Sequence, residues 1–325
     1  MHSPSSVEPV DFVISWVDGN DPAHRQKLAR YTSKVKDASC DDVAGDTRFA
    51  NIGEINYCVA SIHRFARFAR QIFIITDNQN PHLEEFLSQH FDDLIPIRII
   101  DHSVIFKGYE EYLPTFNSRA IEAMMWRIPG LSERFVYLND DFLFVAPCTV
   151  KDFFEGDSTV CYADWYPTYF AKFLRFIKPK KNGHKPVGFK DSMLNAISIT
   201  GSCFRFLYLA HTPRALRRSF FEKFFNENPD VLIRNIRHKF RDAEQYNSQE
   251  LFYMTEHRSG RCLVRSPKTF GLYLKPRKGG DYVRNKLERF DRNHRALFCC
   301  FNSLDQASLE DRKLVMEWIN RRISL

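Results

Sequence analysis

The sequence lacks the cysteine patterns that cross-link small folds or bind zinc. Its 325 residues include eight cysteines; Cys299 and Cys300 are adjacent, the others are scattered, and no Cys-x-x-Cys or Cys/His ligand spacing occurs. A chain of this length can bury about three quarters of the surface that its unfolded state exposes, so it needs no disulfides. We therefore expect reduced, mostly buried thiols in a cytosolic protein.

Long apolar runs are also missing. The most apolar stretch, from Met193 to Ala210, is interrupted by polar residues that include Asn195, Ser198, Ser202 and Arg205. A membrane span needs about 20 apolar residues, and this stretch does not supply them. We therefore expect it to belong to the protein core. The first residues, MHSPSSVEPVD, have neither the basic start nor the apolar centre of a signal peptide, and we expect no export. Internal repeats, low-complexity tracts and heptads are absent from the sequence as well.

Positive charge is in excess. The formal net charge is +7, and basic residues cluster in the second half of the chain, at 172–190, 214–218 and 234–241. Such clusters favour an anionic partner, and nucleotides, nucleic acids and anionic lipids all qualify.

Four segments of the first half, rich in Val, Ile and Phe, predict β-strands: 12–17, 71–76, 95–100 and 135–138. Each runs into an acidic residue, in order Asp18, Asp77, Asp101 and Asp140. Apolar residues at helical spacing over 54–65 and 117–128 alternate with these strands, which predicts an open, largely parallel α/β sheet. Ligands of such sheets bind beyond the carboxyl ends of the strands, where these aspartates fall. The pattern therefore favours a binding site over chance turns.

The apolar run from Phe135 to Val145 is interrupted by Asn139, Asp140 and Asp141. Burying two carboxylates is costly unless something pairs them. A hard divalent cation, Mg²⁺ or Mn²⁺, would do so and would fill the rest of its coordination shell with phosphate and water. A polar turn between two buried strands is the alternative for this fragment alone. Glu122, on the polar face of the 117–128 helix, is expected to reach the same crevice.

The second half is less regular. The segment from Tyr166 to Lys190 mixes aromatic and basic residues with Pro and Gly, which predicts an inserted loop or lid. Its role stays open between a solvated connection, an acceptor platform, a membrane-surface contact and a single-stranded nucleic-acid groove. Thr212 followed by Pro213 predicts a helix start, with the lone His211 just before it. Ser308 and Asp311 form a capping pattern that predicts a final packing helix.

Several motifs, taken in order, resemble the Stealth family. They are VISWVDGNDP from Val13, RFANIGEINYCVASI from Arg48, IFIITDNQ from Ile72, LPTFNSRAIE from Leu113 followed by GLSERFVYLNDDFL, HTPRALRRS from His211 and HKFRDAEQ from His238. The resemblance extends from Asp11 to Asp305. The sequence CCFNSLD from Cys299 departs from the family's usual Cys-x-Asn-Asp final region, which leaves the roles of Asn302 and Asp305 open.

The resemblance implies an enzyme that transfers a sugar-1-phosphate from a UDP-sugar to a hydroxyl of a glycan and releases UMP. Relatives make bacterial capsule or exopolysaccharides, and the animal member makes the lysosomal targeting tag with N-acetylglucosamine phosphate. This chain resembles the bacterial type, working at the cytoplasmic face of the membrane, with contact to the membrane or the capsule assembly machinery as a further expectation. The implied fold is GT-A-like with a helical second-half insertion. We expect a nucleotide-sugar core over 1–150, an inserted basic and aromatic region over 151–200, and a helical region over 201–325.

The resemblance also implies roles for individual residues. The donor site would contain Asp18, Asp21, Asn117 and Arg119. The catalytic centre would contain Glu122, Asp141, His211 and Arg241, with Asp140 beside Asp141. Either Asp140 or Asp141 would hold the Mg²⁺ or Mn²⁺ ion, Arg241 would bind phosphate, and His211 or Glu122 would be the base.

The sequence leaves two rival functions open. One is an ordinary metal-dependent glycosyltransferase, in which the acceptor attacks the sugar carbon and UDP is released. The other is a noncatalytic nucleic-acid-binding protein that uses residues 170–190. The acidic strand ends would repel nucleic-acid phosphates in the absence of a metal, so we expect no nucleic-acid partner.

Overall fold

The computed structural model describes residues 8–32, 53–177, 188–201, 204–276 and 281–325. The first residues of the RFANIGEINYC motif, 48–52, and residues 178–187 of the basic and aromatic segment lie outside these ranges.

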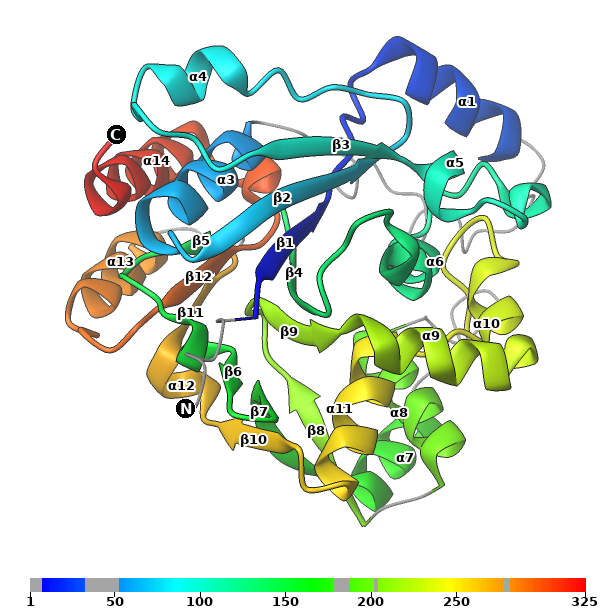
Figure 1. The fold of residues 1–325 in the computed structure, drawn as a ribbon. Coiled ribbons are helices and arrows are strands. Elements are labelled where there is room, and N and C mark those ends of the chain that lie inside the picture. The colour runs from blue at the N-terminus through cyan, green and yellow to red at the C-terminus, as the bar shows by residue number, and fades with distance from the viewer. Residues whose placement is uncertain (1–7, 33–52, 178–187, 202–203, 277–280) are drawn as a thin grey trace, which may run out of the picture.

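A five-stranded sheet forms the centre of the molecule (Figure 1). Its order is β3-β2-β1-β4-β9, with β1 at Val10–Ser15, β2 at Ala69–Thr76, β3 at Ile97–Asp101, β4 at Arg134–Asn139 and β9 at Arg214–Arg217. The first four strands are parallel and β9 is antiparallel to β4. Ser15 pairs with both Ile75 and Asn139, so β1, β2 and β4 end at one edge. The predicted open, largely parallel sheet is confirmed.

Both faces of the sheet are covered, which explains the near-continuous apolar strands. Along β1, Phe12 and Ile14 point to one core, and Val13 points to the other. Helix α3, Glu54–Phe65, covers the first face, and α6, Ser118–Met124, covers the second. Each core also takes residues from the second half of the chain, so the cores do not follow the predicted boundaries at 150 and 200.

The second half contains strands as well as helices. Strands β6, Phe154–Glu155, and β10, Cys262–Arg265, flank β7, Ser158–Pro167, which also pairs with β8, Arg205–Leu209. Strands β11, Gly271–Leu274, and β12, Phe298–Phe301, join β5, Phe142–Phe144. Because β5 directly follows the LNDD motif, this last sheet brings residues near 273 and 300 to the predicted site. The region 201–325 is therefore mixed, and not purely helical.

Two local predictions for the second half are wrong. The helix predicted to begin after Thr212 starts only at Arg218, as α9, Arg218–Glu227. The residues before it form β9, because Ala215 and Leu216 are fully buried in pairing with β4, and this tertiary contact outweighs a local capping signal. The loop predicted from Tyr166 contains a helix, α7, Thr168–Ile177, and Lys190 lies in α8, Phe189–Thr200.

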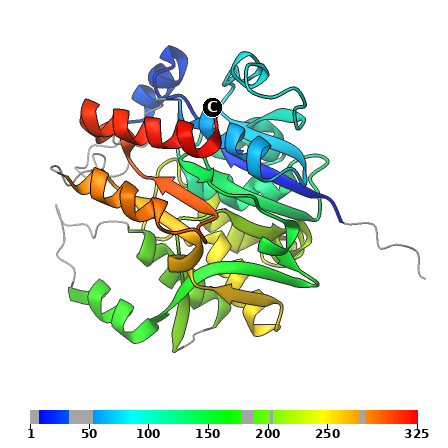
Figure 2. The same cartoon turned by 90° about the vertical axis from the view of Figure 1, so that its left-hand side faces the viewer.

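The remaining helices lie around these sheets (Figure 1). They are α1 at Pro22–Thr32, α4 at Glu84–Ser88, α5 at His102–Ile105, α10 at Pro229–Ile236, α11 at Ser248–Arg258, α12 at Pro267–Phe270, α13 at Tyr282–Asp291 and α14 at Leu309–Ile323. The predicted final helix is confirmed as α14, with the Ser308 hydroxyl accepting from the Asp311 amide at 3.0 Å. It packs on α13 and α3, which ties the end of the chain to the first-half core (Figure 2).

Within the described ranges, no helix combines the length and the apolar character needed to cross a membrane. Six cysteines fall in the same ranges, and all are buried free thiols, as predicted.

Candidate active site

Tyr137 connects the elements that meet at the carboxyl edge of the sheet. Its hydroxyl lies 2.8 Å from the Ser15 hydroxyl of β1 and donates to Asn139 Oδ1 at 2.9 Å. The same hydroxyl lies 3.4 Å from Oε1 of Glu122, which α6 carries. The structure therefore brings Glu122 to the strand end that leads into Asp140 and Asp141.

Glu122 lies among positive charges. Burial raises the pKa of Glu122, while the guanidinium groups of Arg241, Arg119 and Arg214 oppose this shift. Burial in turn lowers the pKa of Arg241 and of Arg214. One carboxylate thus faces three arginines in partly dehydrated surroundings, an arrangement suited to receiving the negative charge of a phosphate. We call this charged region at the carboxyl edge of the sheet, from Glu122 and Arg241 to Asp140 and Asp141, the crevice.

Asn117 places Arg241 next to Glu122. Its amide nitrogen donates to the carbonyls of His238 at 3.1 Å and Phe240 at 2.8 Å, and to Gln245 Oε1 at 2.9 Å. Its Oδ1 accepts from the Arg119 amide at 3.2 Å and caps α6. The segment before and after Arg241 is thereby fixed to the helix that carries Glu122. Asn117 is 1% exposed, and both polar atoms of its side chain form hydrogen bonds within the protein. It is therefore a candidate for a residue that positions its neighbours.

Arg241 and Arg119 differ in what their guanidinium groups contact. Arg241 Nη2 donates to the Ser118 hydroxyl at 2.8 Å, and the side chain is only half-buried. Arg119 is 5% exposed and donates to the carbonyls of Asp242 at 3.3 Å and Gly188 at 3.2 Å. Arg119 therefore contributes positive charge near Glu122 from within the protein, whereas Arg241 can meet a ligand in the crevice.

Asp140 and Asp141 carry charge that the described protein groups do not neutralise. Burial raises the pKa of Asp140 well above its usual range, and Asp141 and Glu54 raise it further. Burial also raises the pKa of Asp141, against hydrogen bonds from Cys300 and Asn302 that lower it. Oδ1 of Asp141 is buried and has no hydrogen-bond partner among the described residues. Two adjacent, cation-free carboxylates with an unpartnered oxygen fit a hard divalent cation such as Mg²⁺ or Mn²⁺.

The predicted donor aspartates lie in the loop after β1. Asp18 Oδ1 accepts from the Asn20 amide at 2.9 Å, and the Asp18 backbone is paired with the Gln79 side chain at 2.8 and 2.9 Å. Asp18 stays partly exposed at the edge of the sheet. Asp21 Oδ1 accepts from the His24 amide at 2.7 Å at the start of α1. Asp18 is therefore placed to meet a ligand, while Asp21 shapes the loop.

The other two strand-end aspartates are already satisfied within the protein. Asp77 accepts two bonds from Lys27, at 2.7 and 2.8 Å, and lies 3.4 Å from His24. These groups hold the pKa of Asp77 at about 2, against the effect of its burial. Asp101 accepts from the Ser103 amide at 2.9 Å and caps α5. Asp77 and Asp101 therefore serve the fold, whereas Asp18 and the aspartates after β4 remain candidates for contact with a ligand.

His211 lies at the rim of the crevice. Its ring stacks on Tyr273 at 4.7 Å and on Phe189 at 6.0 Å, and it meets the edge of Phe142, the neighbour of Asp141, at 6.4 Å. Desolvation by these neighbours, together with Arg214 and Lys275, lowers the pKa of His211 to about 4. The side chain nevertheless remains open to solvent. It is therefore neutral at pH 7 and within reach of an incoming substrate.

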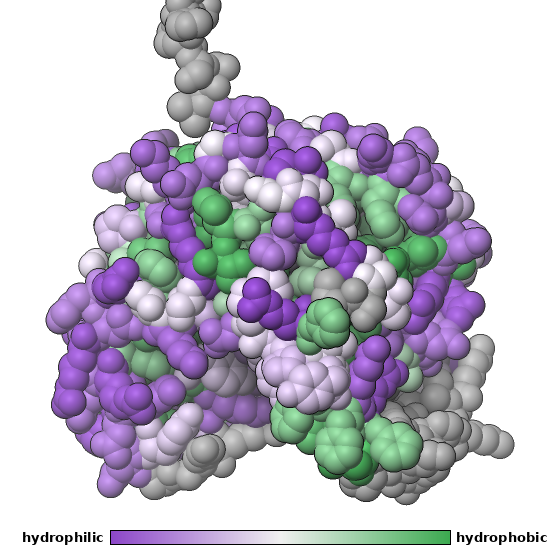
Figure 3. All heavy atoms as spheres, turned by 90° about the horizontal axis from the view of Figure 1, so that it is seen from below, coloured by the Kyte–Doolittle hydropathy of each residue, from purple (hydrophilic) through white to green (hydrophobic). Residues whose placement is uncertain are grey.

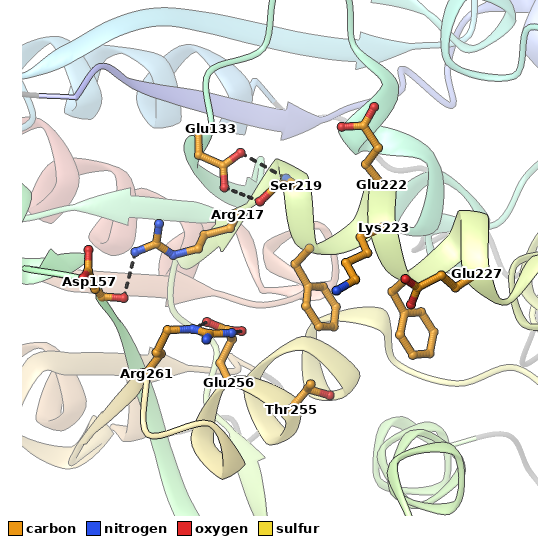
Figure 4. A pocket seen from close by; sticks show the side chains of 12 residues that line it. Glu133, Asp157, Arg217, Ser219, Glu222, Lys223, Glu227, Thr255, Glu256 and Arg261 are labelled. Carbon is orange, nitrogen blue, oxygen red and sulfur yellow. Dashed lines mark hydrogen bonds and ion pairs between the residues drawn. The ribbon is translucent and has the colours of Figure 1, made fainter.

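A large cavity lies elsewhere. It measures about 740 Å³ and lies between α9 and α11, near the amino end of β4 (Figure 4). Its charges are largely compensated: Arg261 pairs with Glu256 at 2.8 Å, and Arg217 donates to the Asp157 carbonyl at 2.8 Å. We place the candidate site at the opposite edge of the sheet. The carboxylates and arginines suited to binding a phosphate lie there without full internal pairing among the described residues, and the volume of a cavity alone indicates no such chemistry.

Another group of metal-ligand side chains lies at the surface beside Arg241. In the part of the chain that the structure describes, His238, Asp242 and Glu244 form the one group of three or more ligand atoms within 4.8 Å of one another. Glu244 is already paired with Arg237, and His238 lies 3.7 Å from Asp242. This group is an ion-pair network on the protein surface and is distinct from the Asp140 and Asp141 pair.

Sequence reasoning assigned no role to several residues of the crevice. Tyr137, Glu54 and Arg214 lie inside the quoted motifs. Their place in these motifs was the signal in the sequence that could have identified them. Tyr273 and Lys275 lie outside every motif and arrive through the pairing of β11 and β12 with β5. Asn302 comes to lie beside Asp141 by the same route.

Comparisons with known proteins point in one direction. Two family models match the chain: Stealth protein conserved region 1 over residues 8–36 and Stealth protein conserved region 2 over residues 48–162. Receptor polysaccharide phosphotransferase WefC of Streptococcus oralis is 29% identical over 299 residues, which cover 84% of this chain and 85% of that protein. Exopolysaccharide phosphotransferase SCO6023 of Streptomyces coelicolor is 30% identical over 317 residues, which cover 95% of this chain but 50% of that protein. The chain spans 27% of a further exopolysaccharide phosphotransferase, SCO6021 of the same organism.

Among solved structures, the apo bifunctional glycosyltransferase WbbM matches 99% of this chain and 51% of its own length, with a TM-score of 0.50 and 11% identity. At this identity the likeness concerns the fold alone. It confirms the predicted GT-A-like α/β architecture.

Proposed function

Because this chain belongs to the Stealth family, we propose that it transfers a sugar-1-phosphate from a UDP-sugar to a hydroxyl of a glycan acceptor and releases UMP. The family relatives are polysaccharide phosphotransferases, which supports transfer of a sugar phosphate in capsule or exopolysaccharide synthesis. One observation supports the proposal: the charges of Asp140, Glu122 and Arg241 all act on the Tyr137 hydroxyl, so an aspartate of the LNDD motif and a half-buried arginine lie around the same residue at the carboxyl edge of the sheet. Carboxylates that can hold a cation, next to guanidinium groups, are what phosphoryl transfer requires.

The donor diphosphate would lie between Asp140 and Asp141 on one side and Arg241 on the other. A Mg²⁺ or Mn²⁺ ion held by the two aspartates would neutralise diphosphate oxygens. Arg241 would contact the transferred phosphate through two parallel N–H groups, which suits a planar phosphate edge. Glu122 would orient this arginine, since its carboxylate interacts with Arg241 and lies 3.4 Å from the Tyr137 hydroxyl. Asp18, at the edge of β1, would meet the nucleoside part.

His211 is the better candidate for the base. A base must be deprotonated at the working pH, and a pKa of about 4 leaves His211 neutral. It is also exposed at the rim, where an acceptor would arrive, whereas Glu122 is held among arginines. His211 would take the proton of the acceptor hydroxyl as its oxygen bonds to the β-phosphorus. The bond from that phosphorus to the bridging oxygen breaks, UMP leaves, and the sugar keeps its anomeric configuration.

The proposed partners follow from this chemistry. They are a UDP-sugar donor and an oligosaccharide or polysaccharide acceptor, met at the cytoplasmic face of the cell membrane together with the capsule assembly machinery. Nucleic acid is not among them, since the crevice that carries the chemistry presents Asp140 and Asp141.

The released nucleotide tests the proposed reaction. We expect purified protein, supplied with Mg²⁺, a panel of UDP-sugars and oligosaccharide acceptors, to release UMP and to form a phosphodiester visible by ³¹P NMR. Release of UDP with a product that contains no phosphorus would instead establish an ordinary glycosyltransferase. Tight, salt-sensitive binding of single-stranded nucleic acid without turnover of any donor would support the noncatalytic alternative.

Replacing His211 tests the identity of the base. We expect His211→Ala to lower kcat by at least about 100-fold with little change in the KM of the donor, because general-base catalysis acts on the transition state. Added imidazole should restore part of the rate. Wild-type turnover should also persist as the pH falls from about 8 through about 6.5, the ordinary pKa of histidine, since the pKa of His211 is lowered.

The matched control is His294→Ala, which removes an exposed histidine after α13. It should leave turnover unchanged. A wild-type kcat in folded His211→Ala would show that His211 is not the base and would favour Glu122 in that role.

A further inference from the structure

The described surface has an apolar cluster on α7 and at the start of β8. We define the α7 apolar face by five exposed side chains: Tyr169, Phe173, Phe176, Ile177 and Phe204. Phe176 is 80% exposed and Phe204 is 96% exposed. Phe204 lies beside the helix start, because its carbonyl accepts from the Thr168 amide at 2.9 Å. Apolar side chains gather at one edge of the molecule seen from below (Figure 3). Exposed apolar groups gathered in this way mark an interaction surface.

The exposed apolar side chains of this face are not needed for α7 to pack on the rest of the protein. The helix already buries Thr168 and Ala171 and packs on α8, β7 and β8. The large aromatic side chains of the face stay more than half exposed. An aromatic-rich face of a surface helix with interspersed basic residues is typical of helices that lie in the boundary between lipid headgroups and acyl chains.

The charges around the α7 apolar face determine what kind of surface it fits. The charged residues of β7, α7, α8 and β8 are four basic and two acidic: Lys172, Arg175, Lys190, Arg205, Asp164 and Asp191. Asp191 lies 3.6 Å from Arg175, and Asp164 lies 3.9 Å from Lys268. Lys172 and Arg205 are exposed among or next to the apolar side chains. The rim is therefore positive, which complements anionic lipid headgroups.

We propose that the α7 apolar face docks on the surface of an anionic lipid bilayer. Phe173, Phe176 and Phe204 would enter the headgroup region, while Lys172 and Arg205 would meet lipid phosphates. An uncharged bilayer would engage the aromatic groups alone and is expected to bind more weakly. This proposal does not depend on the reaction assigned above, because it concerns a surface outside the crevice.

A row of aromatic rings leads from α7 to the crevice. Phe170 on α7 is followed by Tyr166, Tyr208, Phe189 and His211, with successive ring centroids 5.9 to 6.5 Å apart. Docking of α7 would thus bring the rim of the crevice close to the bilayer. On the proposed function, a glycan acceptor held at the membrane through a lipid could then reach His211 without leaving the surface.

The test is vesicle binding by the full chain, measured by flotation. The vesicles would be phosphatidylcholine alone or a mixture of about 3:1 phosphatidylcholine and phosphatidylglycerol. We expect binding to the anionic vesicles, weaker binding at high salt, and little binding to phosphatidylcholine. Phe176→Ser should weaken the partition by about tenfold, since one large apolar side chain is no longer buried on docking. Lys172→Glu should weaken it at low salt only.

The matched control is Leu309→Ser, which removes an apolar side chain that is 83% exposed on α14. It should bind vesicles as the wild type does. Failure of the wild-type chain to bind anionic vesicles, or equal binding by Phe176→Ser, would overturn the proposal. Concentration-dependent dimers in sedimentation, abolished by Phe176→Ser without any vesicle binding, would assign the face to self-association instead. UMP release with a soluble acceptor should be unchanged in Phe176→Ser, so failure of docking and failure of the reaction are distinguishable.

Discussion

Asp141→Asn is expected to lower turnover by about 1000-fold without lowering the melting temperature. The rate falls because a cation that neutralises phosphate charge contributes several kcal/mol to the transition state, and the amide holds it poorly. Stability should not fall, because the raised pKa of Asp141 means that its ionised form is unfavourable in the folded protein. The measurements are kcat over a range of Mg²⁺ concentrations, Mg²⁺ or Mn²⁺ binding by calorimetry, and thermal melting without metal.

Asp77→Asn is the matched control, since Asp77 also ends a strand of the same sheet. The pKa of Asp77 is lowered to about 2, so its charge stabilises the fold above its unfolded pKa, and this contribution is lost as the pH falls through about 2. Removing the charge at pH 7 should therefore cost about 2 kcal/mol of unfolding free energy. A folded Asp141→Asn variant with normal turnover and normal metal binding would remove Asp141 from the site.

Arg241→Lys is expected to lower turnover by on the order of 100-fold even though the positive charge is kept. Lysine cannot present two parallel N–H groups to a phosphate, and it would also lose the bond to the Ser118 hydroxyl. Charge-assisted hydrogen bonds of this kind contribute about 1.5 to 3 kcal/mol each. Because the contact is to the phosphate that is transferred, kcat should fall more than the donor KM rises.

Arg261→Lys serves as the control for this substitution. Arg261 makes a bidentate pair with Glu256 in the large cavity away from the crevice, so the same chemical change there should spare turnover. Equal kinetics for Arg241→Lys and the wild type, with both proteins folded by melting curves, would limit the active centre to the first half of the chain plus His211.

Local patterns were sufficient for much of the first half. The helix expected over 54–65 has those bounds in the structure, and the four parallel strands lie within two residues of their predicted starts. Buried parallel strands and amphipathic helices leave a periodic signal in the sequence, because each residue faces either core or solvent. The helix start predicted after Thr212 failed because β9 is decided by its partner β4, which lies about 80 residues away in the sequence.

The sequence by itself determined that acidic residues end several neighbouring strands and that arginine-rich motifs follow. Only the tertiary structure decided which of these charges are already neutralised. Lys27 satisfies Asp77, whereas no cationic side chain of the described chain reaches Asp141 in the same way. Asn117 likewise gains its role from the carbonyls of a segment more than 120 residues later. The physical reason is that the field at a buried carboxylate depends on groups within a few ångströms in space, and their distance along the chain carries no such information.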